Sequence, residues 1–371
     1  MSRRTAADAG RANPRACDDC LARPWLLERL SGHLDQVRGA VAALLELSDG
    51  ELLAAVCGKQ RESVAAKLGQ FDPAGARERA KVAGLELICR CDPAYPPRLR
   101  ALENPPAVLH VAGGLDRFLK LVGEEPVAVV GARRATRYGV EVAHSLGSGL
   151  GAAGLTVLSG MALGIDSAAH GGALEIGGST VAILPGGADR AYPAAKRALH
   201  AQIRADGAAV SEMPPGAPVR RWTFPARNRI IAALAAMTVV VEAAAKSGAL
   251  LTAADARRLG RPVGAVPGRV TSPASEGSNR LLADGAFVVC GAQDVLDVLY
   301  GAGARRVPAR EQPDLAPELH VLLQAIAEGE ETSRALARAG LGAGQGLAAL
   351  AALELAGLVR REPGGRFSVR P

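Results

Sequence analysis

The sequence predicts an α/β protein built on a doubly wound parallel sheet, and three features of residues 126–187 indicate it. Short apolar runs rich in β-branched residues occur at 127–130, 155–158 and 180–184, which is typical of strands buried on both faces. Helix-length segments, 138–153 and 163–176, separate these runs. Each run then ends in a turn of small residues. Alternating strands and helices give a parallel sheet covered on both faces, so ligands are expected beyond the carboxyl ends of the strands.

Length and charge set the broad class of the protein. The chain has 371 residues, a net charge of +7 and a pI near 9.3, so we expect two or three domains and a polyanionic partner. The alternative explanation of the positive charge is a general compositional bias toward Arg and Ala, unrelated to a binding partner. No apolar run approaches the roughly 20 residues needed to cross a bilayer, and no apolar segment follows the charged first residues as in a signal peptide. We therefore expect a cytoplasmic location and no membrane contact.

The six cysteines do not form the framework of a disulfide-rich protein in a chain of this length. Cys17 and Cys20 have the spacing of half a zinc site, and Cys89 and Cys91 are candidates for the other half. Cys-x-Cys is not the usual second half, however, and a domain with a hydrophobic core does not need the metal. Reduced thiols are therefore the preferred interpretation, and no cofactor or metal is predicted.

The first part of the chain, residues 1–84, predicts a tail over 1–15 followed by a small helical domain. From Trp25 to Ala83 the pattern is helical in short pieces. Ser48 and Glu51 form a capping box, and Asp72-Pro73 opens a further helix. No catalytic cluster occurs here, so we expect a packing or protein-contact role.

Residues 85–300 predict the sheet domain, with at least six parallel strands. Probable strands at 85–89 and 108–111 precede the stretch described above, separated by a segment rich in proline. After it, strands and helices continue to alternate up to residue 299. The predicted elements are helix 193–205, strand 208–210, helix 227–235, strand 238–241, helix 248–259, strand 262–266, helix 279–283, strand 286–289 and helix 293–299.

The last part of the chain predicts a linker, 301–317, and a winged helix, 318–371. Three helices are expected at 318–327, 333–339 and 344–356, and two short strands flank Pro363-Gly364-Gly365. The third helix contains no Lys or Arg, and Gln345 is its one candidate for reading bases. A protein-contact or regulatory role is therefore expected for this domain.

The strand-end turns do not match the common nucleotide-binding motifs. Arg133 stands where a dinucleotide fold needs glycine, and no G-x-x-x-x-G-K-[ST] motif occurs. Several turns instead combine a backbone N–H with a cation or hydroxyl, and N–H groups at helix N-termini hold anions. The residues expected to hold successive phosphates are Gly131, Arg133, Arg134, Ser159, Gly160, Gly186, Gly187, Lys246, Ser247, Gly248, Gly268 and Arg269.

A loop at 212–229, EMPPGAPVRRWTFPARNR, mixes cations and aromatic rings. Trp222 and Phe224 lie among four arginines, Arg220, Arg221, Arg227 and Arg229. Single-stranded nucleic-acid sites combine cations for phosphates with flat rings for bases. The alternative is that the two rings only anchor the loop to the core. The arginines are harder to explain without an anion, since no acid lies among them.

Catalytic candidates are sparse. Asp166 and His170 lie four residues apart on one helix, and Glu212 follows Ser211. Asp166 near a helix start is more often a capping residue, and a histidine such as His170 is more often packed and satisfied. No catalytic residue is predicted, and the chain is not expected to be an enzyme.

The motifs of the chain resemble those of the DprA/Smf family of DNA-processing proteins over nearly its whole length. They occur in the order of that family. They are DPAYPPRL (Asp92 to Leu99), PPAVLHVAG, VGARRAT (Val130 to Thr136), SGMALGIDSAAHGGAL (Ser159 to Leu174), GGADRAYP, SEMPPG, FPARNRIIA (Phe224 to Ala232), VVEAAAKSGALLTAADA (Val240 to Ala256) and AVPG.

The resemblance implies a Rossmann-like core between an N-terminal helical (SAM-like) domain and a C-terminal winged helix. It also implies cooperative single-stranded DNA binding, dimerisation and recruitment of RecA to that DNA, chiefly during natural transformation. Two positions depart from the family pattern: Ala132 where serine is common, and Lys196 where asparagine is common, which would add a phosphate contact. The DNA contacts that the resemblance implies are the Gly131–Arg133 turn, the turn from Gly186 to Tyr192, the arginines Arg227 and Arg229, and Lys246 to Gly248. The predicted DNA-binding residues also include Lys196, Arg220, Arg221, Asn228 and Thr252.

Two other functions remain as alternatives. Nucleotide-monophosphate hydrolases of the lysine-decarboxylase-like (LOG) type share such a core, but their PGG is followed by Gly-Thr and a nearby glutamate. Here Pro185-Gly186-Gly187 is followed by Ala188 and Asp189, so the catalytic part of that motif is missing. A sequence-specific regulator acting through the winged helix is disfavoured because the third helix contains no Lys or Arg.

Overall fold

The computed structural model describes residues 15–37, 40–308, 315–362 and 365–369. The chain divides into two compact units, residues 1–307 and 308–371, which are described separately below. Of the tail predicted over residues 1–15, all but Arg15 lies outside the described residues.

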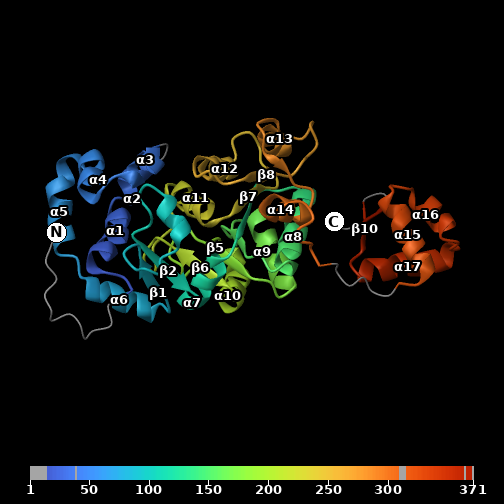
Figure 1. Cartoon of the computed structure of the whole chain (residues 1–371), viewed down its shortest axis with the longest axis horizontal. Helices are drawn as coiled ribbons and strands as arrows, with labels where there is room; N and C mark the ends of the chain where they lie inside the picture. Colours follow the sequence, from blue (N-terminus) through green and yellow to red (C-terminus); the bar gives the residue numbers. More distant parts are fainter. Residues whose placement is uncertain (1–14, 38–39, 309–314, 363–364, 370–371) are drawn as a thin grey trace. The chain divides into compact units, whose positions relative to one another are not determined.

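The first unit is built around a nine-stranded sheet of order β1-β2-β6-β5-β4-β3-β7-β8-β9 (Figure 1). In this spatial order, all neighbouring strands from β6 through β5, β4, β3, β7 and β8 to β9 pair in parallel, which confirms the predicted parallel sheet. The two strands before it, β1 and β2, are antiparallel to their neighbours, a direction that the sequence left open. The strands are β1 (Glu86–Cys89), β2 (Val108–Ala112), β3 (Val127–Val130), β4 (Val157–Ser159), β5 (Thr180–Ile183), β6 (Ala208–Ser211), β7 (Met237–Val240), β8 (Val263–Ala265) and β9 (Phe287–Val288).

The strand order reverses at β3, so successive strands of the chain are added first on one side of β3 and then on the other. From β3 to β6 the chain adds each strand on one side, and β7 then pairs with the other side of β3, with Val130 opposite Val240. Ligands of doubly wound folds bind where the connections diverge in this way. The carboxyl ends of β3 and β7 are therefore the expected site, which we call the switch point.

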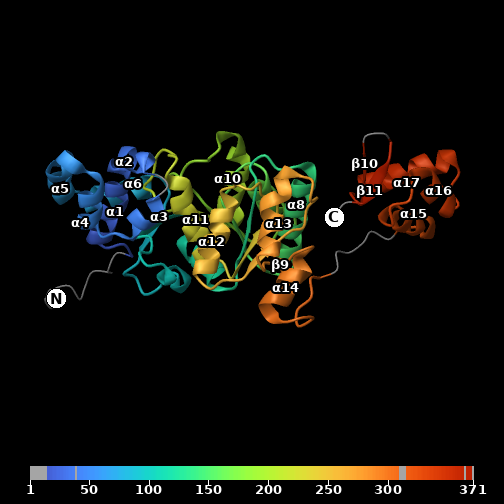
Figure 2. The same ribbon diagram turned by 90° about the horizontal axis from the view of Figure 1, so that it is seen from above.

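Helices cover both faces of the sheet (Figure 2). Side chains alternate along each strand, so Val127 and Val129 pack with helices α8, α9 and α14, whereas Ala128 and Val130 pack with α7, α11, α12 and α13. Helix α10 packs beside α9. The bounds are α7 (Leu115–Gly123), α8 (Arg137–Ala152), α9 (Ile165–Glu175), α10 (Arg197–Asp206), α11 (Thr223–Leu234), α12 (Ala249–Arg258), α13 (Glu276–Ala283) and α14 (Ala292–Tyr300).

Two helices of this unit differ from the sequence prediction. Helix α7 was not predicted, although Gly113 and Gly114, both with positive φ, separate its nine residues from β2. Helix α11 begins at Thr223 rather than at Arg227, since Pro225 is accommodated in its first turn. Arg227 and Arg229 thus lie inside the helix and do not open it.

Six short α-helices precede the sheet among the described residues, and the first five share a hydrophobic cluster with the loop after β6. Trp222 is fully buried there, with Met213 and the leucines of α1 to α4. The predicted Ser48–Glu51 capping box is present, and Asp72 caps α6 through the Gly75 N–H. The bounds are α1 (Asp18–Arg29), α2 (Ser31–Gln36), α3 (Val41–Glu46), α4 (Asp49–Val56), α5 (Arg61–Gly69) and α6 (Pro73–Val82).

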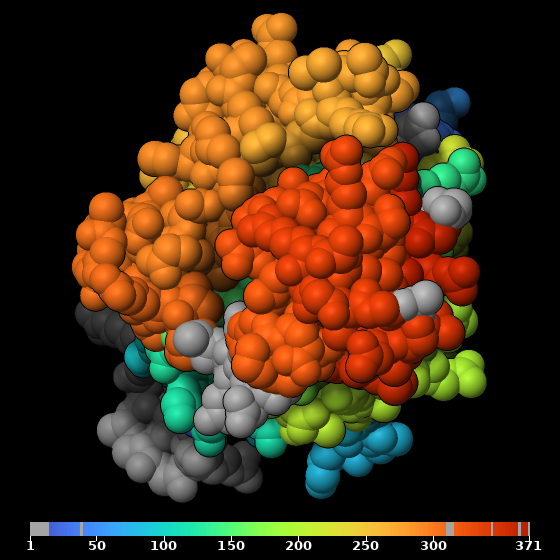
Figure 3. All heavy atoms as spheres, turned by 90° about the vertical axis from the view of Figure 1, so that its right-hand side faces the viewer, coloured from blue at the N-terminus to red at the C-terminus, as the bar shows by residue number. Residues whose placement is uncertain are grey.

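The second unit has three helices and a two-stranded antiparallel hairpin, in the predicted order; its surface is red in Figure 3. Leu322, Leu353 and Val359 are fully buried in its own core. The tip of the predicted wing at Pro363 and Gly364 lies outside the described residues. The bounds are α15 (Pro317–Ala327), α16 (Thr332–Arg338), α17 (Ala343–Leu355), β10 (Val359–Arg361) and β11 (Phe367–Val369). None of the helices among the described residues is long and apolar enough to cross a membrane.

Buried histidines predict how the stability of the first unit depends on pH. Burial lowers the pKa of His110 to about 4 and that of His170 to about 3. Below its ordinary pKa near 6.5 each histidine is protonated in the unfolded chain before it is protonated in the folded one. The free energy of unfolding should therefore fall from pH 6.5 towards pH 4, by about 1.4 kcal/mol per pH unit for each histidine.

Urea unfolding followed by tryptophan fluorescence between pH 4.5 and 7 measures this slope. A His110→Gln variant should lose the contribution of this one histidine, about 1.4 kcal/mol per pH unit, and His33→Gln, on α2, should keep the whole slope. An unchanged slope in the His110 variant would contradict the assignment.

Candidate nucleic-acid interface

A pocket of about 250 Å³ lies at the switch point. Its walls are the turn after β3, the first turns of α11 and the start of α12. The structure thus brings together residues that the sequence predicted from three separate motifs. Those lining the pocket are Gly131, Arg133, Arg227, Asn228, Ser247, Gly248 and Thr252.

Arg133 is the exposed cation of this pocket. Its guanidinium carbon lies 4.2 Å from the centroid of the Phe224 ring, a cation–π contact. The Phe224 ring lies 5.8 Å from that of Tyr192, which is 40% exposed. A cation and two rings therefore share one exposed cluster, as binding of phosphates and bases requires.

No acidic partner neutralises Arg133 or the exposed Arg134 among the residues that the structure describes. The two acids nearest in the fold have other partners. Glu242 accepts hydrogen bonds from the Thr136 N–H (2.7 Å) and hydroxyl (2.8 Å). Asp166 accepts the N–H groups of Gly160 and Ala162. Arg133 is therefore available to an anion.

Glu242 also explains why the pocket does not suit a dinucleotide. In such folds a pyrophosphate sits at the N-terminus of the helix after the first strand. Here that helix is α8, whose N-cap is Thr136, and the Glu242 carboxylate already accepts the Thr136 N–H. The chain itself supplies the negative charge that this helix end favours.

Arg227 is a second cation of the pocket, fixed by burial. It is 7% exposed and donates from Nη1 to the Ile183 carbonyl at 2.8 Å. Burial lowers its pKa to about 10, and the charge of Asp166 opposes that shift. A side chain at Gly160 would place Cβ 1.4 Å from Arg227 Nη1, so the missing side chain of Gly160 makes room for the guanidinium.

The candidate catalytic residues have structural roles. Burial raises the pKa of Asp166, and its carboxylate holds the turn after β4 together through the N–H groups of Gly160 and Ala162. His170 is fully buried, with Nδ1 2.6 Å from the Thr180 hydroxyl oxygen. That hydroxyl donates to the Val157 carbonyl, so His170 is the donor in the pair. These contacts favour the capping and packing interpretations.

The turns after β4 and β5 do not offer the predicted phosphate donors. Ser159 is fully buried and donates to the Val129 carbonyl at 2.6 Å. The Gly160 N–H is bound to Asp166, and the Gly187 N–H donates to the Ala217 carbonyl at 3.1 Å. Gly186 is buried against the same loop. These four residues hold neighbouring loops in place, which corrects the expectation that every strand end contributes.

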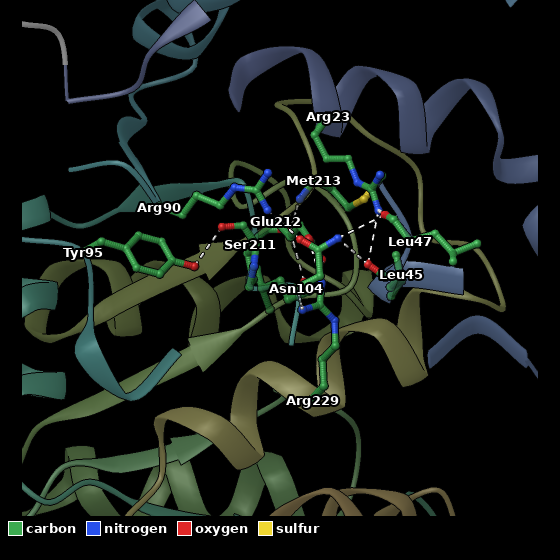
Figure 4. Close-up of polar contacts among 12 residues, drawn as sticks. Arg23, Leu45, Leu47, Arg90, Tyr95, Asn104, Ser211, Glu212, Met213 and Arg229 are labelled. Carbon is green, nitrogen blue, oxygen red and sulfur yellow. Dashed lines mark hydrogen bonds and ion pairs between the residues drawn. The ribbon is translucent and has the colours of Figure 1, made fainter. Parts of the chain in front are cut away.

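Arg229 is likewise a structural residue. It is 8% exposed, and its Nη2 donates to both carboxylate oxygens of Glu212 at 2.7 Å (Figure 4). The sequence suggested that the loop arginines lack an acid, but the fold brings Glu212 from the end of β6 against α11. We therefore leave Arg229 out of the interface, and Glu212 is not free for catalysis.

The Arg229 pair extends into a network that ends in the N-terminal helices (Figure 4). Arg229 Nη1 donates to the Asn104 carbonyl at 3.1 Å, and the Asn104 amide donates to the carbonyls of Leu45 (2.8 Å) and Leu47 (3.2 Å). Arg23 donates to the same two carbonyls. Sequence reasoning missed Asn104, since a single Asn before two prolines carries no distinctive signal.

The remaining predicted residues divide by exposure. Lys246, Arg220 and Arg221 are exposed, and Lys196 is half-buried at the start of α10. Trp222 is fully buried, and its backbone N–H donates to Asp35 at 3.0 Å. The anchoring interpretation therefore holds for Trp222, whereas Phe224 belongs to the exposed cluster.

A larger cavity of about 740 Å³ adjoins the pocket and shares Pro225 and Leu251 with it. Its charged lining is mixed: Arg221, Arg229 and Arg258 face Glu46, Glu103 and Asp255. Arg258 pairs with Asp255 at 2.5 Å. Equal numbers of positive and negative side chains line this cavity, so it attracts a polyanion only weakly. We therefore place the interface at the smaller pocket. Leu251, 53% exposed between the two, was not singled out from the sequence, where it is one more apolar helix residue.

The fold and the site together define a doubly wound α/β protein that presents cations and aromatic rings at the switch point of its sheet. Comparison with known proteins agrees with this class. The chain belongs to the DprA/Smf family: the family model for DNA recombination-mediator protein A matches residues 86–300.

Individual relatives cover much of the chain. It is 34% identical to Protein Smf of Synechocystis, over 94% of this chain and 95% of that protein. It is 35% identical to Protein Smf of Escherichia coli, over 74% and 75% of the two chains. Among solved structures, DNA processing protein A of Streptococcus pneumoniae matches 75% of this chain and 98% of its own, with a TM-score of 0.62 and 32% identity.

DNA processing protein A of Helicobacter pylori is a second structural match, over 55% of this chain and 92% of its own, with a TM-score of 0.50 and 30% identity. That structure is described as showing a unique mode of binding single-stranded DNA.

The buried Arg229–Glu212 pair predicts a stability defect. Arg229→Met should lower the free energy of unfolding by about 3–5 kcal/mol, because it leaves the Glu212 carboxylate buried without a counter-charge. An Arg229→Met/Glu212→Leu double variant should recover part of the loss. Urea unfolding measures both, with exposed Arg221→Ala as the control. A single variant of normal stability that binds DNA more weakly would show that Arg229 is an interface residue instead.

Proposed function

We propose that this chain binds single-stranded DNA at the switch-point pocket, protects incoming strands and helps to load RecA onto them during natural transformation or recombination. In this proposal it acts in the cytoplasm as a homodimer. One observation carries the DNA-binding step: Arg133 lies unpaired over Phe224 at a pocket whose deeper cation is Arg227. The family supports the rest, including its DNA-processing role in recombination.

The chemistry of the pocket favours single strands over duplex DNA. Phe224 and Tyr192 offer ring faces to unstacked bases, which a duplex keeps stacked inside. Arg133, Arg134 and Lys246 are exposed and can follow the phosphates of a flexible strand. Stacking and phosphate contacts are sequence-tolerant, so we expect little sequence preference.

The hydrolase alternative finds less support in the geometry. A nucleotide-monophosphate hydrolase needs an acid that can act on a bound substrate. The acid that lines the pocket, Asp166, is buried and accepts two backbone N–H groups. Glu212 is bound to Arg229.

We assign the second unit as a winged helix with a protein-contact role. Its third helix, α17, exposes Leu347 (72%) and Leu355 (90%), and no Lys or Arg lies on it. Exposed apolar side chains on a helix without cations suit a protein surface better than a DNA groove.

Salt-titrated binding to single- and double-stranded oligonucleotides tests the proposed function. We expect single strands to bind more tightly than duplexes. The logarithm of the binding constant should fall with the logarithm of the salt concentration with a slope of about −2 or steeper, because Arg133, Arg134 and Lys246 each contribute about −0.7 when a phosphate contact releases a counterion. Binding that ignores salt, or that prefers one duplex sequence, would refute the proposal. Turnover of AMP by the same preparation, lost in Asp166→Ala, would support the hydrolase.

Arg133 should matter more than its neighbour Arg137. Arg133→Ala should weaken single-strand binding by about 1.5–3 kcal/mol, the value of a charge-assisted hydrogen bond. The matched control is Arg137→Ala on α8, an exposed arginine that already pairs with Glu141 at 3.0 Å. Arg334→Ala, in the second unit, is a further control. A lowered melting temperature with unchanged affinity would show that Arg133 is structural.

A further inference from the structure

Four cysteines meet where the N-terminal helices join the edge of the sheet. Cys17 is the N-cap of α1 and Cys20 lies in its first turn. Cys89 ends β1, and Cys91 follows in the next turn. The four sulfur atoms all lie within 4.8 Å of one another, although the two pairs are some seventy residues apart in the sequence.

The spacing of the sulfur atoms fits a tetrahedral metal ion. Zinc–sulfur bonds of about 2.3 Å place the ligands of a tetrahedral site about 3.8 Å apart. The Cys20 and Cys91 sulfurs are 3.6 Å apart, and those of Cys17 and Cys89 are 3.9 Å apart. Each pair joins the helix to the sheet edge, so an ion at the centre would bind both elements at once.

The backbone around the cluster suits thiolate ligands. The Cys17 N–H points at the Cys89 sulfur, 3.4 Å away, and such N–H groups stabilise the negative charge of a metal-bound sulfur. Cys17 and Cys20 also lie at the N-terminus of the twelve-residue helix α1, where the helix dipole favours thiolate.

The turn after β1 explains how an unusual Cys-x-Cys spacing supplies two ligands. The Asp92 N–H donates to the Cys89 carbonyl at 2.9 Å, which closes a turn that folds Cys91 back toward Cys89. Cys17 is partly exposed and Cys91 is exposed, while Cys20 and Cys89 are buried. The cluster therefore has a buried side against the core and an open side through which an ion can enter.

We propose that Cys17, Cys20, Cys89 and Cys91 form a structural zinc site that clamps α1 to the edge of the sheet. Four thiolates fill the coordination sphere and leave no position for a substrate, so the site stabilises the fold and takes no part in chemistry. This revises the preference for reduced thiols, which rested on spacing in the sequence alone.

Metal analysis of the purified full-length chain, prepared without a polyhistidine tag and under reducing conditions, tests the proposal. We expect about one zinc ion per chain, since one tetrahedral site is present. Cys91→Ser should fold, because Cys91 is exposed, and should weaken zinc binding at least about tenfold. Cys17→Ser/Cys20→Ser should abolish it. The matched control, Cys290→Ser, removes an exposed cysteine outside the cluster and should retain the metal.

Two further measurements distinguish the alternatives. Cobalt added to the metal-free chain should give thiolate-to-metal charge-transfer absorption that is lost in the double variant, and a strong zinc chelator should lower the melting temperature of the wild type and of Cys290→Ser alone. Several results would overturn the proposal: no zinc after reconstitution, iron in its place, equal zinc in all variants, or two disulfides in the metal-depleted native chain that block reconstitution even after reduction.

Discussion

The close approach of the turns after β3 and β4, with Arg227 of α11 against the second of them, is the constraint on which the site depends. Gly164 has φ +78°, and a side chain there would place Cβ 2.3 Å from the Ala132 carbonyl oxygen. Gly160 leaves the space that Arg227 fills. Between them Met161, fully buried, adopts φ 54°, a conformation that only the surrounding packing sustains. The turn bearing Arg133 can rest on this loop because Gly164 lacks a side chain, and Arg227 can lie beside the loop because Gly160 lacks one.

A second constraint joins the helices to the sheet. The Arg229–Glu212 pair, continued through Asn104 to the carbonyls of Leu45 and Leu47, crosses the boundary that the sequence suggested between two domains. Trp222, held by Asp35, packs across the same boundary. The loop after β6 therefore serves the helical region and the interface at once: its buried side anchors it, and its exposed side presents Phe224.

The sequence predicted what depends on local pattern. Apolar runs and small-residue turns indicated the strands around Val127 and Thr180, and motif order indicated the family. The sequence did not show which polar groups would be hydrogen-bonded within the folded chain and so be unavailable to a ligand. From the sequence alone, Arg229, Ser159 and Gly160 look like ligand contacts. In the fold, Glu212 binds Arg229, the Val129 carbonyl binds Ser159 and Asp166 binds the Gly160 N–H. The sequence offered the four cysteines as two possible halves of a zinc site, but no spacing rule predicts that Cys91 turns back toward Cys20.

Burial of Arg227 has a consequence for how binding free energy is distributed. Its guanidinium is desolvated and held by the Ile183 carbonyl in the unbound chain, so that cost belongs to folding. Under the proposed function, the phosphate nearest to it would meet a preorganised charge. Arg134 and Lys246 are exposed, and each must give up as much as about 2 kcal/mol of rotamer freedom to hold a phosphate. One nucleotide should therefore be held tightly at Arg227, whereas the nucleotides on either side should exchange readily between Arg134, Lys246 and solvent.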